Sequence, residues 1–592
     1  MNKVWNLDRL YTGFDDPAYR TDFETLKDKV DALAALAGQL ESMEPSEGLR
    51  EAIRLQEEIA LLGSKLSGYP RLRTAANAKD SEAGSQSGQI SSLLSNTAGA
   101  RAAFRQWACA LPDLMERVTG DDYLRDYEFF FAGMKEMSRH SLGVEASQVA
   151  AKMNMSGSAA WSKLHGYLTS TVPVSYRGKT INLSAVRNLA RDPDPAVRRD
   201  AYEAELKCYD AIKDPCAHAL NAIKLETITS CQMGHYESPL EMTLKRADMK
   251  RETLDAMLGA MDEYLPEFWK YLKTKGRLLG HENGLPWYDL FAPVGKESAA
   301  FTPEEAKEFL LAQFATFDAE LTDMARRAFD EAWIDFFPRD GKRGGAFCSS
   351  ILGLGESRIL TNYDGSFSAI TTLAHELGHA FHNLCIRDHR PLNHGYSMPV
   401  AETASTFNEC VVMNAAIAAA ADPQEKLALI ESQLQKITQV ICDIYSRYRF
   451  EARVFENRQA RFMDADVFCD FMIEAQKQSY GDGLDHSCLH PYMWVNKQHY
   501  YGPVYYNFPY AFGALFSRGL YACYEAEGAA FVPKYKKLLY TTTVATAEDT
   551  AMVAGIDLTD RAFWRAALQT VAERIDQFCE LAEETMQSAK NG

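Results

Sequence analysis

Residues 371–382 read TTLAHELGHAFH, and this stretch guides the interpretation of the whole chain. Its apolar residues recur at helical spacing, which predicts a helix with one buried face. On such a helix His375 and His379 lie one turn apart, close enough for both imidazoles to bind the same metal ion. Glu376 leaves the helix about 100° away from His375, beside such an ion rather than bound to it. The stretch therefore predicts a metal site with a free carboxylate next to it.

A free carboxylate beside a metal indicates hydrolytic chemistry. A catalytic zinc ion lowers the pKa of its bound water towards ~7, and Glu376 is then positioned to take the proton as a general base. The alternative is that two unrelated histidines lie four residues apart by chance. With 13 histidines in 592 residues, that coincidence is expected in roughly 2% of comparable chains. We therefore expect zinc.

A catalytic zinc site has three protein ligands and one open position, so a third ligand should follow His379. Metzincins place a histidine six residues later, but Cys385 occupies that position, which excludes this class. The carboxylates before residue 411 are Asp388, Glu402 and Glu409. Asp388 lies in a polar, turn-like run, whereas Glu402 opens a helix-like segment rich in small residues. Glu409 lies two turns further along the same face, where it either orients a ligand histidine or is a surface glutamate.

The remainder of the chain has the pattern of a mainly α protein with small β pieces. Residues 172–183 predict a β-hairpin, and a glycine-rich segment before the motif contains two β-rich runs, 346–351 and 358–363. After residue 367 the chain again has helical spacing up to its polar tail. We expect three parts: an N-terminal helical domain (1–115), a connecting segment with the hairpin (116–190) and a catalytic domain (191–592).

Composition and charge narrow the function classes. The chain is 46% hydrophobic and 24% charged, as is ordinary for a globular protein with a large core. Its formal net charge of −18 disfavours a nucleic-acid partner, since no basic patch stands out. No run approaches the roughly 18 apolar residues that span a bilayer, and the first residues lack the features of a secretory signal. Twelve scattered cysteines indicate free thiols, so we expect a cytoplasmic protein without a membrane partner.

Four stretches together resemble the thimet oligopeptidase family, specifically its oligoendopeptidase F branch. They are HELGHAFH at 375–382, PVAETASTFNE at 399–409, WNLDRLY at 5–11 and RGGAFCSS at 343–350. The resemblance covers most of the chain. It implies a multi-helix, zincin-type fold around a deep channel that admits unstructured oligopeptides and excludes folded proteins. It also implies that Glu402 is the third zinc ligand, although the spacer of 22 residues after His379 is a little shorter than the family pattern.

A second group of polar residues lies far downstream, where 499–513 reads HYYGPVYYNFPYAFG. Phenol and imidazole groups can donate hydrogen bonds to the oxyanion that forms during peptide hydrolysis. The family carries a His and Tyr cluster opposite its zinc, and the resemblance maps this cluster first onto His499 and Tyr510, then onto Tyr506 or Tyr505. The alternative for each tyrosine is a place in an aromatic-rich core helix.

The expected function is that of a zinc-dependent metalloendopeptidase with one zinc per chain and oligopeptides as substrates. One alternative is a zinc carboxypeptidase of similar helical build. Another is a non-catalytic peptide-binding protein with a structural zinc, which is disfavoured because structural sites usually have four protein ligands. The β-rich segment 344–363 either offers an edge strand to an extended substrate or is an ordinary structural hairpin.

Overall fold

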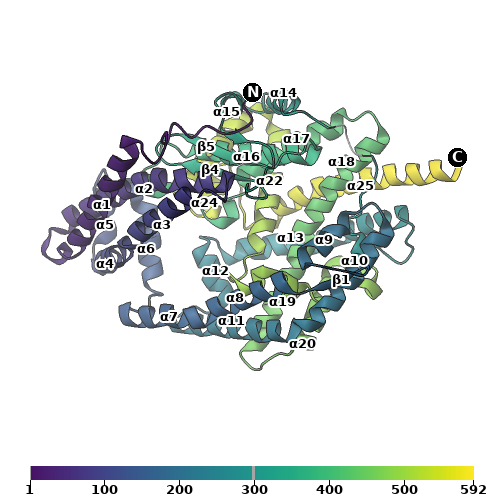
Figure 1. Ribbon diagram of the computed structural model, residues 1–592, viewed down its shortest axis with the longest axis horizontal. Helices are drawn as coiled ribbons and strands as arrows, with labels where there is room; N and C mark the ends of the chain where they lie inside the picture. The colour runs from purple at the N-terminus through teal and green to yellow at the C-terminus, as the bar shows by residue number, and fades with distance from the viewer. Residues whose placement is uncertain (1, 297–299, 592) are drawn as a thin grey trace.

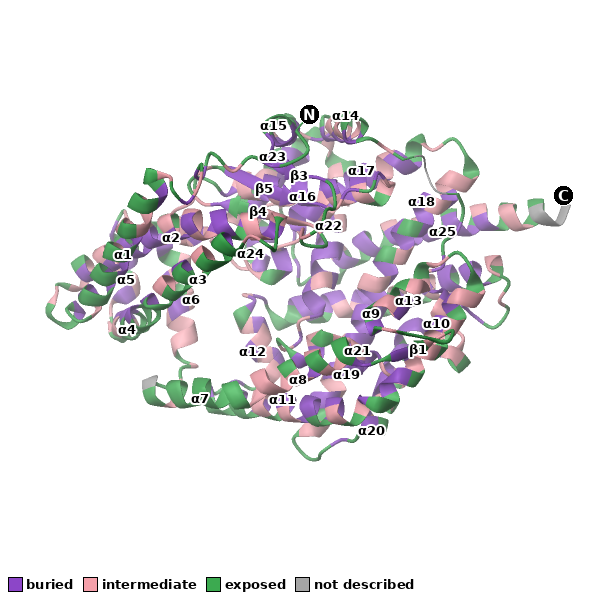
Figure 2. Cartoon of the chain, viewed as in Figure 1, coloured by how far each residue is buried: buried purple, intermediate pink, exposed green. Residues whose placement is uncertain are grey.

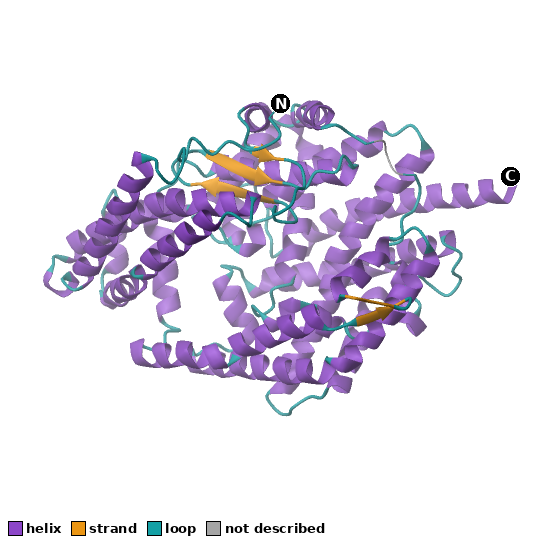
Figure 3. Cartoon of the chain, viewed as in Figure 1, coloured by secondary structure: helices purple, strands orange, loops and turns teal. Residues whose placement is uncertain are grey.

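The computed structural model describes residues 2–296 and 300–591, and it confirms the predicted mainly α fold (Figure 3). Helices account for 72% of the chain, and the described residues contribute two small β-sheets. Among the helices of these residues, none has both the length and the apolar character needed to cross a membrane. The twelve cysteines are free thiols.

The N-terminal helices form a lobe with a core of its own (Figure 1). Asp16 and Glu44 cap helices α1 (Pro17–Ala37) and α2 (Pro45–Ala76) by accepting a backbone N–H, and each helix starts with a proline. The lobe is completed by α3 (Ser81–Ser95), α4 (Thr97–Ala110) and α6 (Glu128–Ser138). Its core contains apolar residues at helical spacing, including Leu26, Val30, Leu33, Leu49 and Ile53.

A second core surrounds the hairpin. Strand β1 (Val174–Tyr176) pairs antiparallel with β2 (Lys179–Ile181), which confirms the hairpin predicted over 172–183. Arg177 and Gly178 have positive φ, as a tight two-residue turn requires. The helices around it are α8 (Ser158–Thr171), α10 (Pro195–Cys208), α11 (Lys213–Met233), α19 (Ile444–Arg458) and α20 (Ala465–Tyr480). This core joins residues 172–223 with 450–501, and the predicted three-part division of the chain stays a prediction.

The third and largest core contains the metal motif. Its main helices are α13 (Arg251–Leu278), α16 (Phe367–Cys385), α17 (Thr403–Ala419), α22 (Phe508–Glu527) and α25 (Arg561–Asn591). Within it α17 packs between α16 and α22. Figure 2 shows buried residues concentrated in these central helices, whereas α7 (Val144–Ser156) is exposed along its length. The motif therefore lies in the largest of the buried cores.

A three-stranded sheet lies directly before α16 in the chain and against it in space. Its order is β3 (Ile334–Asp335), β5 (Glu356–Leu360), β4 (Phe347–Ile351), with β4 antiparallel to β5 and at the edge. The first predicted run, 346–351, matches β4. The second, 358–363, is wrong by two to three residues: the turn between the strands is short, so Glu356 already pairs with Ile351 and pairing with β4 ends at Leu360.

Candidate metal centre

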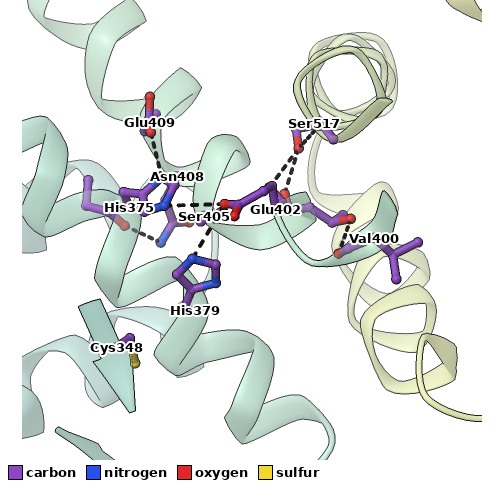
Figure 4. A network of polar contacts seen from close by, with 12 residues as sticks. Cys348, His375, His379, Val400, Glu402, Ser405, Asn408, Glu409 and Ser517 are labelled. Atoms are coloured by element: carbon purple, nitrogen blue, oxygen red, sulfur yellow. Dashed lines mark hydrogen bonds and ion pairs between the residues drawn. The ribbon is translucent and has the colours of Figure 1, made fainter. Parts of the chain in front are cut away.

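Helix α16 holds the two motif histidines on one face (Figure 4). The helix begins at Phe367 because Ser366 accepts a hydrogen bond from the N–H of Ala369. The imidazole rings of His375 and His379 then follow one turn apart, with centroids separated by 4.9 Å. This confirms the juxtaposition predicted from their spacing.

Glu402 reaches the histidines from a second segment, at the N-cap position of α17. Its Oε2 lies 3.3 Å from His375 Nε2 and 3.5 Å from His379 Nε2. Ser405 Oγ donates a hydrogen bond of 2.7 Å to the same oxygen and helps to orient it. Ligand atoms in a tetrahedral site with bonds of about 2.0–2.1 Å are about 3.3–3.4 Å apart. The three residues, which also form a potential metal-binding group with all donor atoms within 4.8 Å, therefore fit a zinc ion.

Two glycines allow the helices to come this close. A Cβ at Gly378 would lie 2.5 Å from both the Ala404 carbonyl oxygen and the Ser405 Cα, so α16 and α17 can pack at this distance only without a side chain there. A Cβ at Gly513, on α22, would lie 2.9 Å from the Glu402 Cβ. Gly378 therefore sets the distance between the histidines and Glu402.

Glu409 is buried and contacts His375, so the alternative of a surface glutamate is wrong. Its Oε1 lies 2.6 Å from His375 Nδ1, and its other oxygen pairs with Lys436. Burial alone would raise the pKa of Glu409, but Lys436 and His375 lower it to about 2. Because an ionised carboxylate only accepts hydrogen bonds, His375 Nδ1 donates and Nε2 is left free for a metal.

Glu376 is buried beside the histidines and outside the group of metal donors. Burial raises its pKa to about 7, with His375 opposing the shift and Glu402 adding to it. The backbone N–H of Cys348, on the edge strand β4, faces this carboxylate and opposes the rise in its pKa. A carboxyl group whose pKa lies near neutrality can both accept and release a proton.

His499, Tyr506 and Tyr510 form a cluster near the metal centre. The His499 ring centroid lies 5.2 Å from that of Tyr506 and 6.0 Å from that of Tyr510. Tyr510 lines a cavity of about 290 Å³ together with His375 and Glu402. Tyr505 does not join the cluster: its ring is buried against Tyr448 and Phe455, in the place of a core residue.

Sequence reasoning missed the residue that fixes His499. Arg447 Nη1 lies 3.5 Å from His499 Nδ1 and donates to Asn507 Oδ1 at 3.1 Å, while Asp443 pairs with the other end of the guanidinium. Burial, together with the charges of Arg447 and Lys497, lowers the pKa of His499. Since an arginine only donates, Nδ1 of the neutral imidazole accepts and Nε2 carries a proton. No sequence motif marks Arg447.

A mainly helical protein whose helix-borne HExxH motif meets a distant glutamate belongs to the class of metallopeptidases. The sequence model of Peptidase family M3 matches residues 188–569. Oligopeptidase PepF of Bacillus subtilis is 23% identical, over 99% of this chain and 88% of its own length. An oligoendopeptidase F homologue of Mycoplasma pneumoniae is 23% identical, over 95% of each chain.

The fold agrees with these matches. The crystal structure of oligoendopeptidase-F from Enterococcus faecium superposes with a TM-score of 0.71 at 18% identity, over 96% of this chain and 99% of that one. The chain therefore belongs to peptidase family M3, in its oligoendopeptidase F branch, and is a metalloendopeptidase. The resemblance that the sequence indicated is confirmed.

Proposed function

We propose that the protein is a zinc-dependent oligoendopeptidase that hydrolyses short, unstructured peptides. His375, His379 and Glu402 would hold one zinc ion per chain. The observation that carries this proposal is the convergence of these three donors at separations suited to a tetrahedral ion. A zinc ion held there would polarise the scissile carbonyl and acidify a water molecule in its open position.

Glu376 acts as the general base in this proposal. Its buried carboxylate accepts a proton from the attacking water as the oxygen bonds to the carbonyl carbon. When the C–N bond breaks, Glu376 returns the proton to the leaving amine. The raised pKa of about 7, caused chiefly by burial, supports both transfers.

His499 and Tyr510 are proposed to stabilise the carbonyl oxygen as it gains negative charge, with Tyr506 as a further donor. The contact with Arg447 leaves the Nε2–H of His499 available as a donor. The phenol of Tyr510 lines the cavity shared with His375 and Glu402. Donors of this kind act on the transition state because charge develops on the oxygen only there.

The substrate is proposed to be an extended peptide that adds to the edge strand β4. One side of β4 pairs with β5, and the Cys348 N–H on this strand faces the Glu376 carboxylate. A peptide aligned along this edge would have its backbone next to the base. Strand addition requires an unfolded segment of chain, which favours flexible oligopeptides over folded proteins.

The Glu376→Gln variant tests this proposal. We expect zinc content and melting temperature near wild type and a kcat lower by about 10²–10⁴, because only the base is removed. Glu145→Gln, on the exposed helix α7, is the matched control and should behave as wild type. The assay uses an internally cleavable peptide with both termini blocked, with and without a chelator. Full turnover by metal-stripped protein would overturn the proposal, and retained activity of Glu376→Gln would assign the proton transfer to another group.

A further inference from the structure

The cavity beside the metal centre contains a guanidinium group without a partner. Arg518, on α22, lines this cavity together with His375 and Glu402. Among the described residues it makes no hydrogen bond or ion pair, and its Nε is buried without an acceptor. Lys436, whose basic side chain also lines the cavity, is already paired with Glu409. A buried polar group without a partner is costly, so such groups are rare unless a ligand satisfies them.

Among the described residues, no acid forms an ion pair with Arg518. Glu402 and Glu409, which also line the cavity, are engaged at the metal centre. Glu525, Glu573 and Arg574 line the adjoining cavity, which Arg518 also borders, and neither acid forms an ion pair with Arg518. The charge of Arg518 is therefore left without a contacting counter-ion among the described residues, which suits this end of the cavity to an anion.

The rest of the cavity is suited to part of a peptide. Its walls combine apolar and small polar side chains, among them Phe367, Thr371, Met413, Ile437 and Ala514. Arg518 follows Tyr510 by eight positions on α22, or about 12 Å along a helix. This is the reach of about four residues of extended chain, so Arg518 lies within a few residues of the proposed scissile bond.

We propose that this cavity is a substrate subsite for a peptide carboxylate, held by the guanidinium of Arg518. The inference rests on the proposed peptidase function and adds a substrate class to it. Arginine suits this role because its planar fork can donate two hydrogen bonds to one carboxylate. The carboxylate belongs either to an acidic side chain or to the free C-terminus of the peptide, and both have the same chemistry.

Two sets of peptides distinguish these sources. One set has blocked termini and compares Glu with Gln at each position around the cleaved bond; the other compares a free with an amidated C-terminus in a neutral sequence. For wild type we expect kcat/KM to favour the carboxylate in one set by about tenfold or more, as for one charge-assisted hydrogen bond. In Arg518→Met the ratio of kcat/KM for the carboxylate peptide to kcat/KM for its neutral counterpart should fall towards one, chiefly through KM. Arg518→Lys should keep part of the preference.

Arg574→Met is the matched control, because Arg574 lines only the adjoining cavity and already donates to Asn414 and Gln577. It should keep the wild-type ratio. A wild-type enzyme that cuts neutral peptides but shows no preference for a carboxylate in either set overturns this inference and leaves the peptidase proposal standing. An unchanged ratio in Arg518→Met also overturns it. Failure of wild type to cut any peptide overturns the peptidase proposal itself. The wild-type comparison decides the question even if the variants fold poorly.

Discussion

Gly378→Ala is expected to damage the metal centre without touching a metal ligand. The added Cβ would lie 2.5 Å from the Ala404 carbonyl oxygen and the Ser405 Cα. Ordinary contacts of this kind begin near 3.4 Å, so α16 and α17 must separate by roughly 1 Å, and overpacking of this type costs about 1–3 kcal/mol. The histidines lie on α16 and Glu402 begins α17, so the separation falls directly on the ligand set.

Metal bonds tolerate displacements of only about 0.2 Å. We therefore expect the zinc affinity of Gly378→Ala to fall by at least about tenfold, and kcat/KM by about 10²-fold, as for a 1 Å misplacement of catalytic groups. Competition with a chromophoric chelator measures the zinc affinity. Peptide hydrolysis at saturating zinc measures kcat/KM.

Gly88→Ala is the matched control, because Gly88 lies exposed on α3 with nothing within 4 Å of the added Cβ. It should leave zinc affinity unchanged and stabilise its helix slightly. If Gly378→Ala bound zinc and turned over peptide like wild type, the argument that Gly378 sets the spacing of the ligands would be refuted.

Three further predictions concern the metal, pH and substrate size. Glu409→Gln should weaken zinc binding by about 10–100-fold, because the amide no longer provides an anionic acceptor for His375 Nδ1; the same chelator competition measures it. Burial alone would raise the pKa of Glu205, but Arg187 and His490 lower it to about 2. Its folded-state pKa thus lies below the unfolded value of about 4.3, so its stabilising contribution is present above that pH and is lost as pH falls towards 2. The melting temperatures of wild type and Glu205→Gln should differ at neutral pH and converge in acid; a constant gap would contradict this. Finally, a flexible peptide of about ten residues, roughly 35 Å when extended, should be cut, whereas a stably folded protein should resist. Mass spectrometry of the products measures both rates, and equal rates would show that the site is open to folded proteins.

The parts of the site that follow local rules could be predicted from the sequence. The four-residue spacing of His375 and His379 determines their positions once the helix forms. Glu409 contacts His375 from the same face as Glu402, as two helical turns between them suggest. The contact between Arg447 and His499 could not be predicted, because it joins positions 52 residues apart through tertiary packing. Tyr505 and Tyr506 are neighbours in sequence, yet only the backbone conformation decides which phenol joins the cluster; Tyr505 has a positive φ.

The lobes were likewise only partly predictable. Helical spacing indicates which residues of the N-terminal helices are buried, but it does not indicate which helices share a core. Residues 172–223 share one with 450–501, and nothing in either stretch alone specifies its partner. The register of β5 depended on the length of a turn, which pattern alone leaves uncertain by a few residues.

Strand β5 has a consequence for protein engineering. Its successive side chains point to opposite faces, so Ile359 packs into the central core and Leu360 into the core of the N-terminal lobe. Arg358 on the same strand donates to the carbonyl of Asn6 at 2.8 Å. A fragment trimmed to residues 188–569 would expose Leu360 to water and leave Arg358 without this acceptor. Residues 188–569 are therefore not a separable module, because β5 belongs to both cores and would lose its contacts on one face if the N-terminal lobe were removed.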